Sequence, residues 1–192
     1  IMDYETGEIL FSKNGDQPMP PSSMSKLMTA LMVFEALEAG TLSLEDELPV
    51  SVRAWREGGA ASGGSTMFLD VNSRARVDDL LRGIIVQSGN DACIVVAEAL
   101  GGSEEAFADM MTRRARELGL ETASFRNSTG LTAEGHEISA EDLARLAAHI
   151  IRNHPQFYDL YSETSFSYNG ITQANRNPLL GVVDGADGLK TG

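Results

Sequence analysis

A serine and a lysine three residues apart are the first candidates for chemistry in this sequence. Ser23 and Lys26 follow Pro20-Pro21 and open a stretch whose apolar residues recur at helical spacing. Three residues are nearly one helical turn, so the two side chains lie on the same face. A serine hydroxyl becomes a nucleophile when a neighbouring base takes its proton, and a lysine kept neutral by its surroundings is such a base. The pair therefore predicts nucleophilic catalysis.

The same spacing also fits a capped helix with a surface lysine, since about one S-x-x-K is expected by chance in a chain of this length. The choice of basic residues favours the chemical interpretation. Lysine occurs only at Lys13, Lys26 and Lys190, and arginine supplies every other basic position. Because arginine stays charged and cannot act as a base, a lysine at position 26 suggests lysine chemistry there.

Two further short motifs are candidates to join the pair. Ser88-Gly89-Asn90 interrupts an apolar stretch between two predicted helices, where its polar side chains could reach a cleft; such residues more usually mark a helix connection. Lys190-Thr191-Gly192 occurs once. On a strand, Lys190 and Gly192 share a face and Thr191 points the other way, and a solvent-facing strand is the alternative.

In the order S-x-x-K, S-x-N and K-T-G, these motifs form the signature of penicillin-binding proteins and class A β-lactamases. The chain resembles the low-molecular-weight D-alanyl-D-alanine carboxypeptidases, serine peptidases of the bacterial cell wall that also bind penicillin. The resemblance covers essentially the full length. It rests on Asp3-Tyr4 with Thr6-Gly7, residues 21–29, Met67-Phe68-Leu69, Leu81-Arg82-Gly83-Ile84, residues 87–93, Asn169-Gly170-Ile171 with Asn175-Arg176-Asn177, and residues 187–192.

The resemblance implies an acyl-enzyme mechanism on a peptidoglycan stem peptide ending in D-Ala-D-Ala. Ser23 would attack the carbonyl of the penultimate D-alanine, and Lys26 would take the serine proton. Ser88 would pass protons to the leaving amine, and water would then hydrolyse the acyl-enzyme. Penicillin and other β-lactams would acylate the same serine, and no cofactor or metal is implied.

The remaining motif residues would bind the substrate. By the resemblance, Asn90 would bind the peptide amide and hold Lys26, and Thr191 would hydrogen-bond the terminal carboxylate. Lys190 would attract that carboxylate, and its positive field would depress the pKa of Lys26. Gly192 completes the substrate-binding set.

The expected elements are strands at both ends of the chain and helices in the middle. The resemblance implies an α+β fold of the β-lactamase/transpeptidase type, with an antiparallel sheet flanked by helices and a helical lobe, and residues 1–192 as a single catalytic domain. The sequence predicts a hairpin at 1–13, a strand at 48–52, a hairpin around Asn169-Gly170, a strand from Leu189, and helices at 23–38, 77–87, 91–100, 103–118 and 139–152. Ser103 and Ser139 are the expected caps of the last two helices, with Asp142 completing a capping box.

In the family, the sheet continues beyond the K-T-G strand. One oxyanion-hole donor is the backbone N–H of the nucleophilic serine, here Ser23, and the other belongs to the residue after the K-T-G glycine. Loss of such a donor typically costs about 3 kcal/mol of transition-state stabilisation. Missing central strands also leave edges unpaired. We therefore expect residues 1–192 to be an incomplete fragment that is inactive and poorly folded alone.

The amino-acid composition limits which partners the protein can bind and where it can act. A net charge of −13 argues against non-specific binding to nucleic acid and to anionic lipid. Cys93, the single cysteine, excludes an internal disulfide framework and is expected to pack in an apolar helix. No apolar run is long enough to span a membrane, and we expect any targeting segment or anchor to lie outside this chain. The resemblance implies a periplasmic or cell-envelope location.

Other functions remain as alternatives. A class A β-lactamase needs a glutamate, usually within E-x-x-L-N, to activate water; no such string occurs, and Glu134, Glu137 and Glu141 lack that context. A penicillin-binding sensor or scaffold that is not a peptidase is a further alternative.

Two other hydrolase classes lack their sequence patterns. His136, His149 and His154 lack close ligand spacing, which argues against a metal hydrolase, and we expect His149 to be structural. No G-x-S-x-G elbow of a Ser-His-Asp hydrolase is present.

Overall fold

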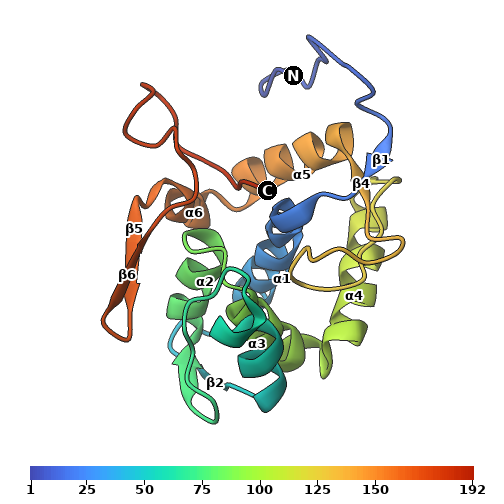
Figure 1. Cartoon of the computed structure of the whole chain (residues 1–192). Helices are drawn as coiled ribbons and strands as arrows, with labels where there is room; N and C mark the ends of the chain where they lie inside the picture. The colour runs from blue at the N-terminus through green and yellow to red at the C-terminus, as the bar shows by residue number, and fades with distance from the viewer.

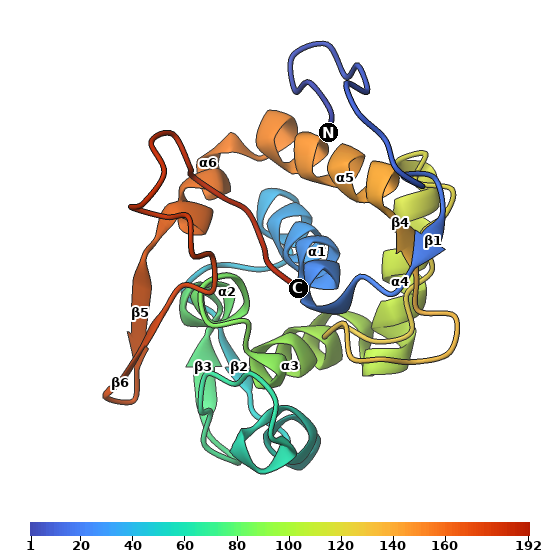
Figure 2. The same cartoon turned by 45° about the horizontal axis from the view of Figure 1, so that its top comes forward.

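One helix, α1 (Lys26–Glu38), runs through the middle of the computed structural model, which describes all 192 residues. Nearly every residue from Lys26 to Phe34 is buried, and a helix buried on all sides belongs in the interior of its domain. Figures 1 and 2 show the other long helices packed around α1. These are α2 (Val77–Ile85), α3 (Asn90–Gly101), α4 (Glu104–Glu117) and α5 (Ala140–Asn153).

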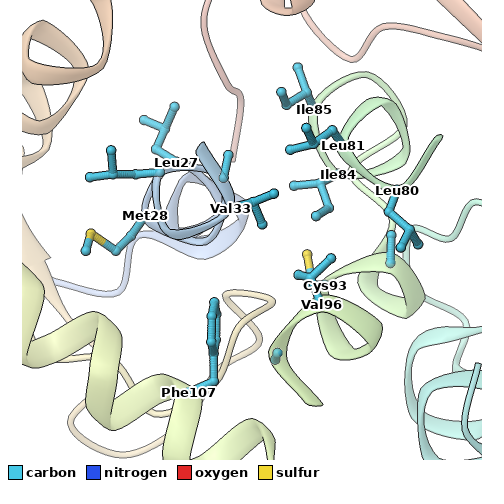
Figure 3. Close-up of a cluster of buried hydrophobic side chains, with 14 of the residues drawn as sticks. Leu27, Met28, Val33, Leu80, Leu81, Ile84, Ile85, Cys93, Val96 and Phe107 are labelled. Carbon is cyan, nitrogen blue, oxygen red and sulfur yellow. The ribbon is translucent and has the colours of Figure 1, made fainter. Parts of the chain in front are cut away.

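The contacts of α1 with its neighbours form one hydrophobic core. Figure 3 shows its centre, which contains Leu27, Met28 and Val33 of α1, Leu80, Leu81, Ile84 and Ile85 of α2, Cys93 and Val96 of α3, and Phe107 of α4. The apolar face predicted for the helix at 77–87 is therefore confirmed. The packing role predicted for Cys93 is confirmed too, and burial raises the pKa of its thiol to about 12.

Short segments complete the chain. The helical ones are the 3₁₀ turns η1 (Ser22–Ser25), η3 (Ala60–Ser62) and η4 (Asp159–Ser162), the π-helical turn η2 (Ala54–Gly58), and α6 (Pro155–Tyr158). The strands form antiparallel pairs: β1 (Pro18–Met19) with β4 (Ile138–Ser139), β2 (Glu47–Pro49) with β3 (Arg74–Arg76), and β5 (Ser165–Tyr168) with β6 (Ile171–Ala174).

The extent of the sheet differs from the prediction. The strands form three separate two-stranded ladders instead of one sheet flanked by helices. In residues 1–13 the predicted hairpin is reduced to a single bridge between Met2 and Ile9. Residues 189–192, predicted to open a strand, form none. A strand is defined by hydrogen bonds to a neighbour, and neither terminal segment lies against an extended neighbour that continues its ladder.

Local capping signals were better predictors than terminal strand patterns. The Ser103 hydroxyl accepts a hydrogen bond from Ala106 N at the start of α4, and the Ser139 hydroxyl accepts one from Asp142 N at the start of α5. The capping box itself is wrong. The Asp142 carboxylate accepts hydrogen bonds from the backbone N–H and the hydroxyl of Thr122 instead of one from the backbone N–H of Ser139, because Thr122 lies against the start of α5.

The predicted hairpin at Asn169-Gly170 is confirmed. Both residues have positive φ, 47° and 74°, which is the conformation that a two-residue turn between β5 and β6 requires. The strand predicted at 48–52 is shorter in the structure, where it spans Glu47–Pro49 and pairs with β3. Among the helices, none combines the length and apolar character needed to cross a bilayer.

Candidate active site

Ser23 lies in a tight turn at the entrance to the central helix. The predicted helix at 23–38 is divided: Ser22–Ser25 form the 3₁₀ turn η1, and the α-helix begins at Lys26. Gly130 packs so closely on this turn that an added Cβ would lie 1.9 Å from the carbonyl oxygen of Ser22. Only glycine fits there, so the loop that contains Gly130 fixes the position of the serine turn.

Lys26 is the centre of a buried polar cluster. Its side chain is 1% exposed, and its Nζ lies 3.2 Å from Ser23 Oγ, 2.8 Å from Asn90 Oδ1 and 2.6 Å from the carbonyl oxygen of Thr129. An ammonium group has three donors, and all three are satisfied here. The predicted proximity of Ser23 and Lys26 is thus confirmed, as is the hydrogen bond by which Asn90 holds the lysine.

Burial controls the charge of this lysine. Loss of water around Lys26 lowers its pKa below the ordinary value, and the acidic groups of Asp91 and Cys93 oppose that shift. Burial also lowers the pKa of Lys190 to about 8, with repulsion from Lys26 as the second cause. We predicted that Lys190 depresses the pKa of Lys26, but desolvation is the main cause at Lys26. A lysine of lowered pKa gives up its proton more easily, as a general base must.

Ser88 and Asn90 lie where the chain turns from α2 into α3. Ser88 is 3% exposed and has a positive φ of 60°. The turn is held by hydrogen bonds from Gly89 N to the carbonyl oxygen of Gly83 and from Asn90 N to that of Ser65, both of 2.8 Å. Lys26 donates a hydrogen bond to Asn90 but none to Ser88. Of the two residues predicted from this motif, only Asn90 is a direct partner of the lysine.

The K-T-G segment lies beside the serine turn, although it is not a strand. Figure 2 shows the C-terminus next to the start of α1, and a Cβ on Gly192 would lie 3.0 Å from the carbonyl oxygen of Pro21. The Lys190 ammonium donates to the carbonyl oxygen of Thr191 at 3.1 Å. The structure therefore brings the third motif to the first, with Lys190 near enough for its pKa to respond to Lys26.

Sequence reasoning missed the loop that supplies the third partner of Lys26. Asn127 Oδ1 accepts hydrogen bonds from Thr129 N, Thr129 Oγ1 and Gly130 N, and so shapes the turn. Glu104 Oε1 accepts from both the backbone N–H and the hydroxyl of Ser128. The run Asn-Ser-Thr-Gly at 127–130 is a turn signal in the sequence, but it does not indicate a contact with Lys26.

Glu104 should therefore position the carbonyl that holds Lys26. In a Glu104→Ala variant, buried donors of Ser128 lose their acceptor, and we expect the free energy of unfolding to fall by about 2–4 kcal/mol. Urea unfolding measures this loss. The matched control is Glu105→Ala: Glu105 pairs with the same Arg53 but is exposed, so the expected loss is below about 1 kcal/mol. Equal losses in the two variants would contradict the role given to Glu104.

Other candidate residues lie outside the cluster. Glu134 is exposed, Glu137 pairs with Ser124 through its backbone, and the Glu141 carboxylate accepts from Ser12. None of the three is a hydrogen-bond partner of Ser23 or Lys26. His136 lies next to the serine turn η1, where its Nε2 is 2.7 Å from Ser25 Oγ.

The two remaining histidines lack close ligand spacing in the sequence, yet the fold brings them together. The ligand atoms of His149, His154 and Glu35 lie within 4.8 Å of one another. The five-residue spacing of the histidines spans the end of α5, where the chain turns back.

The comparisons with known proteins agree with this geometry. A family model described as D-alanyl-D-alanine carboxypeptidase, peptidase S11, matches residues 1–192. The chain belongs to this family. Among carboxypeptidase relatives, DacD of Escherichia coli is 43% identical over 100% of this chain and 50% of its own length. DacF of Bacillus subtilis is 36% identical over 100% of this chain and 49% of its own length. The chain thus spans about half the length of these relatives.

Solved structures of penicillin-binding proteins confirm the predicted fold class. Penicillin-binding protein 6B from Escherichia coli is 44% identical, with a TM-score of 0.91 over 100% of this chain and 61% of that one. Penicillin-binding protein D2 from Listeria monocytogenes, solved in an ampicillin-bound form, is 30% identical, with a TM-score of 0.81 over 100% of this chain and 76% of that one. The arrangement of α1 and the surrounding helices is therefore that of the penicillin-binding proteins.

Proposed function

We propose that residues 1–192 carry the catalytic domain of a serine-type D-Ala-D-Ala carboxypeptidase. Ser23 Oγ attacks the carbonyl carbon of the penultimate D-alanine and passes its proton to a neutral Lys26. The bond to the terminal D-alanine breaks, its amine takes a proton by way of Lys26 and Ser88, and an acyl-serine ester remains. Water then cleaves the ester and releases the shortened peptide.

Substrate binding is assigned to the residues around this pair. Asn90 would hold the peptide amide in addition to Lys26. Lys190 supplies positive charge for the terminal carboxylate, Thr191 a hydroxyl donor, and Gly192 a backbone that approaches closely without a side chain. The substrate is a peptidoglycan stem peptide, and β-lactams react at the same serine. A periplasmic or cell-envelope location belongs to this proposal, because such peptides are found there.

The observation that carries the proposal is the 3.2 Å contact between Ser23 Oγ and the buried Lys26 Nζ. Incubation of a version of the protein extended past Gly192 with a pentapeptide ending in D-Ala-D-Ala tests it, with released D-alanine and intact mass as the readouts. Stoichiometric D-alanine release together with a persistent benzylpenicillin adduct is the expected result. Rapid penicillin turnover without an adduct would instead indicate a β-lactamase, and an adduct without D-alanine release a sensor.

The same assay addresses the expectation that residues 1–192 alone are inactive and poorly folded, which stays a prediction. The measurements are a thermal melt and the rate of D-alanine release from this chain. A cooperative melt accompanied by D-alanine release would overturn that expectation.

The charge of Lys190 should determine how kcat/KM depends on pH. Its pKa of about 8 means that the charge offered to the substrate carboxylate is lost as pH rises through that value. We expect kcat/KM to fall by about tenfold per pH unit above pH 8, and Lys190→Arg to move this fall to higher pH, because arginine stays charged. An unchanged profile in the variant would rule out Lys190 as the titrating group.

Stability should change in the opposite direction over the same pH range. An unfolded lysine keeps its proton up to about pH 10.4, so the unfolded chain binds more protons than the folded chain above pH 8. This group therefore adds stability as pH rises from about 8 to 10, while activity falls.

A further inference from the structure

A second cluster of polar side chains lies at the far end of α1, away from the serine turn. Glu35 comes from α1, His149 from α5, and His154 from the residue that ends α5. One potential ligand atom from each lies within 4.8 Å of the other two. Glu35 is nine residues beyond Lys26, which is about 14 Å along a helix. The cluster is therefore separate from the proposed catalytic residues.

The surroundings of His154 prepare it for a metal. Its side chain is buried, and its Nδ1 lies 2.9 Å from Glu38 Oε1. A carboxylate at that position accepts a hydrogen bond from Nδ1–H, which leaves the lone pair on Nε2. The same carboxylate–histidine arrangement orients histidine ligands and raises their basicity in zinc proteins.

His149 has an unsatisfied nitrogen in this cluster. Its Nδ1 accepts a hydrogen bond from the Asn153 amide at 3.1 Å, so the neutral ring carries its proton on Nε2, which is buried and has no hydrogen-bond partner. A buried polar atom without a partner typically costs about 1–3 kcal/mol, so such an atom calls for an explanation. Binding of a cation at Nε2 would remove this unpaired donor; it requires the tautomer with the proton on Nδ1, which forms when the exposed Asn153 side chain turns its amide oxygen toward Nδ1.

Glu35 can provide the third ligand without giving up its ion pair. The Arg114 guanidinium donates to Oε1 twice, at 2.9 and 2.8 Å, and to Oε2 once, at 3.1 Å. A carboxylate has about four lone-pair positions, so Oε2 retains capacity for a cation. Arg114 also pairs with Glu117.

We propose that Glu35, His149 and His154 bind a divalent transition-metal ion of the zinc type, with water at the fourth position. Two imidazoles and one carboxylate form a ligand set that zinc uses in proteins. Tetrahedral coordination requires ligand atoms roughly 3.3 Å apart, so atoms now separated by at most 4.8 Å must close in by up to about 1.5 Å. His149 also lines a cavity of about 300 Å³ together with Arg145, Arg152 and Asn153, whereas Glu35 and His154 do not line it. The ion would fasten α1 to α5.

Titration of the untagged, metal-free protein with zinc chloride by calorimetry tests the site, with cobalt(II) absorption as a second readout of histidine ligation. We expect one ion per chain with micromolar affinity. Binding should weaken at least 30-fold in His149→Leu and in Glu35→Gln. The matched control for the charge change is Glu117→Gln, which removes a carboxylate from the same Arg114 without removing a ligand, and it should keep affinity within about threefold.

Several outcomes would overturn the proposal. Absence of one-to-one binding in the wild type would do so, and would show that His149 Nε2 is satisfied by water. Equal zinc affinity in wild type and either ligand variant would place any bound ion elsewhere. If His149→Leu fails to fold by circular dichroism, Glu35→Gln decides the question, because glutamine preserves the size of the side chain. Ser23→Ala should leave zinc affinity unchanged, which keeps this test independent of the proposed peptidase activity.

Discussion

Replacement of Ser23 by alanine is expected to eliminate the benzylpenicillin adduct and to lower kcat for D-alanine release by about 10⁴-fold or more. The reason is that the hydroxyl is the proposed site of the acyl bond, and Ser23 Oγ is the only hydroxyl group hydrogen-bonded to Lys26 Nζ. Lys26 keeps two of its three hydrogen-bond partners, Asn90 and Thr129, in the variant. The fold and its melting temperature should therefore change little. Intact-protein mass spectrometry and a D-alanine assay measure the two effects.

Ser22→Gly is the matched control for this change. Ser22 is the adjacent serine of the same 3₁₀ turn, is exposed, and has a positive φ of 53°, a conformation that glycine adopts without strain. This variant should keep both the adduct and the turnover rate within about threefold. An adduct of unchanged mass and yield in Ser23→Ala would refute the assignment of the nucleophile.

Replacement of Lys26 by arginine is expected to lower the rate of acylation by about 10²- to 10⁴-fold. Arginine keeps the positive charge and can donate hydrogen bonds to Asn90 and Thr129, but its guanidinium does not lose its proton near neutral pH. Lys26→Met removes the charge as well, and should show the same kinetic loss with the cavity still filled. The second-order rate constant for acylation by a fluorescent penicillin is the quantity to compare.

The two Lys26 variants separate two roles of the side chain. If Lys26→Arg acylates at the wild-type rate while Lys26→Met does not, the lysine acts through its charge, and its role as general base is wrong. Lys13→Met is the control for loss of a lysine, because Lys13 is exposed and lies outside the cluster. It should acylate at the wild-type rate.

The sequence predicted those features that depend on near neighbours in the chain. Serine caps at Ser103 and Ser139 and the Asn169-Gly170 turn depend on a few consecutive residues, and all three are present. The capping role of Asp142 failed because Thr122, twenty residues away, competes for the carboxylate. A local pattern cannot indicate such a competitor.

In the candidate site, too, contacts between near neighbours in the sequence were predicted and contacts between distant residues were missed. The three-residue spacing of Ser23 and Lys26 predicted their contact, whereas the position of Asn90 came from the resemblance of the S-x-N motif to a family. The carbonyl oxygen of Thr129 carries no side-chain signature, and it meets Lys26 across 103 residues of sequence. The Glu35, His149 and His154 cluster was missed for a similar reason: two helices must pack before the three side chains meet.

The central position of α1 has a consequence for local opening of the protein. The helix that carries Lys26 also supplies Leu31, Val33 and Phe34 to the core, each 0% exposed. Its backbone amides can then exchange with deuterium only when the surrounding helices separate, so they should be among the slowest in the molecule. Ser23, in the preceding turn, is outside that protection. The proposed base is therefore held by the most slowly opening unit of the fold, whereas the position of the nucleophile depends on the packing of its turn against Gly130.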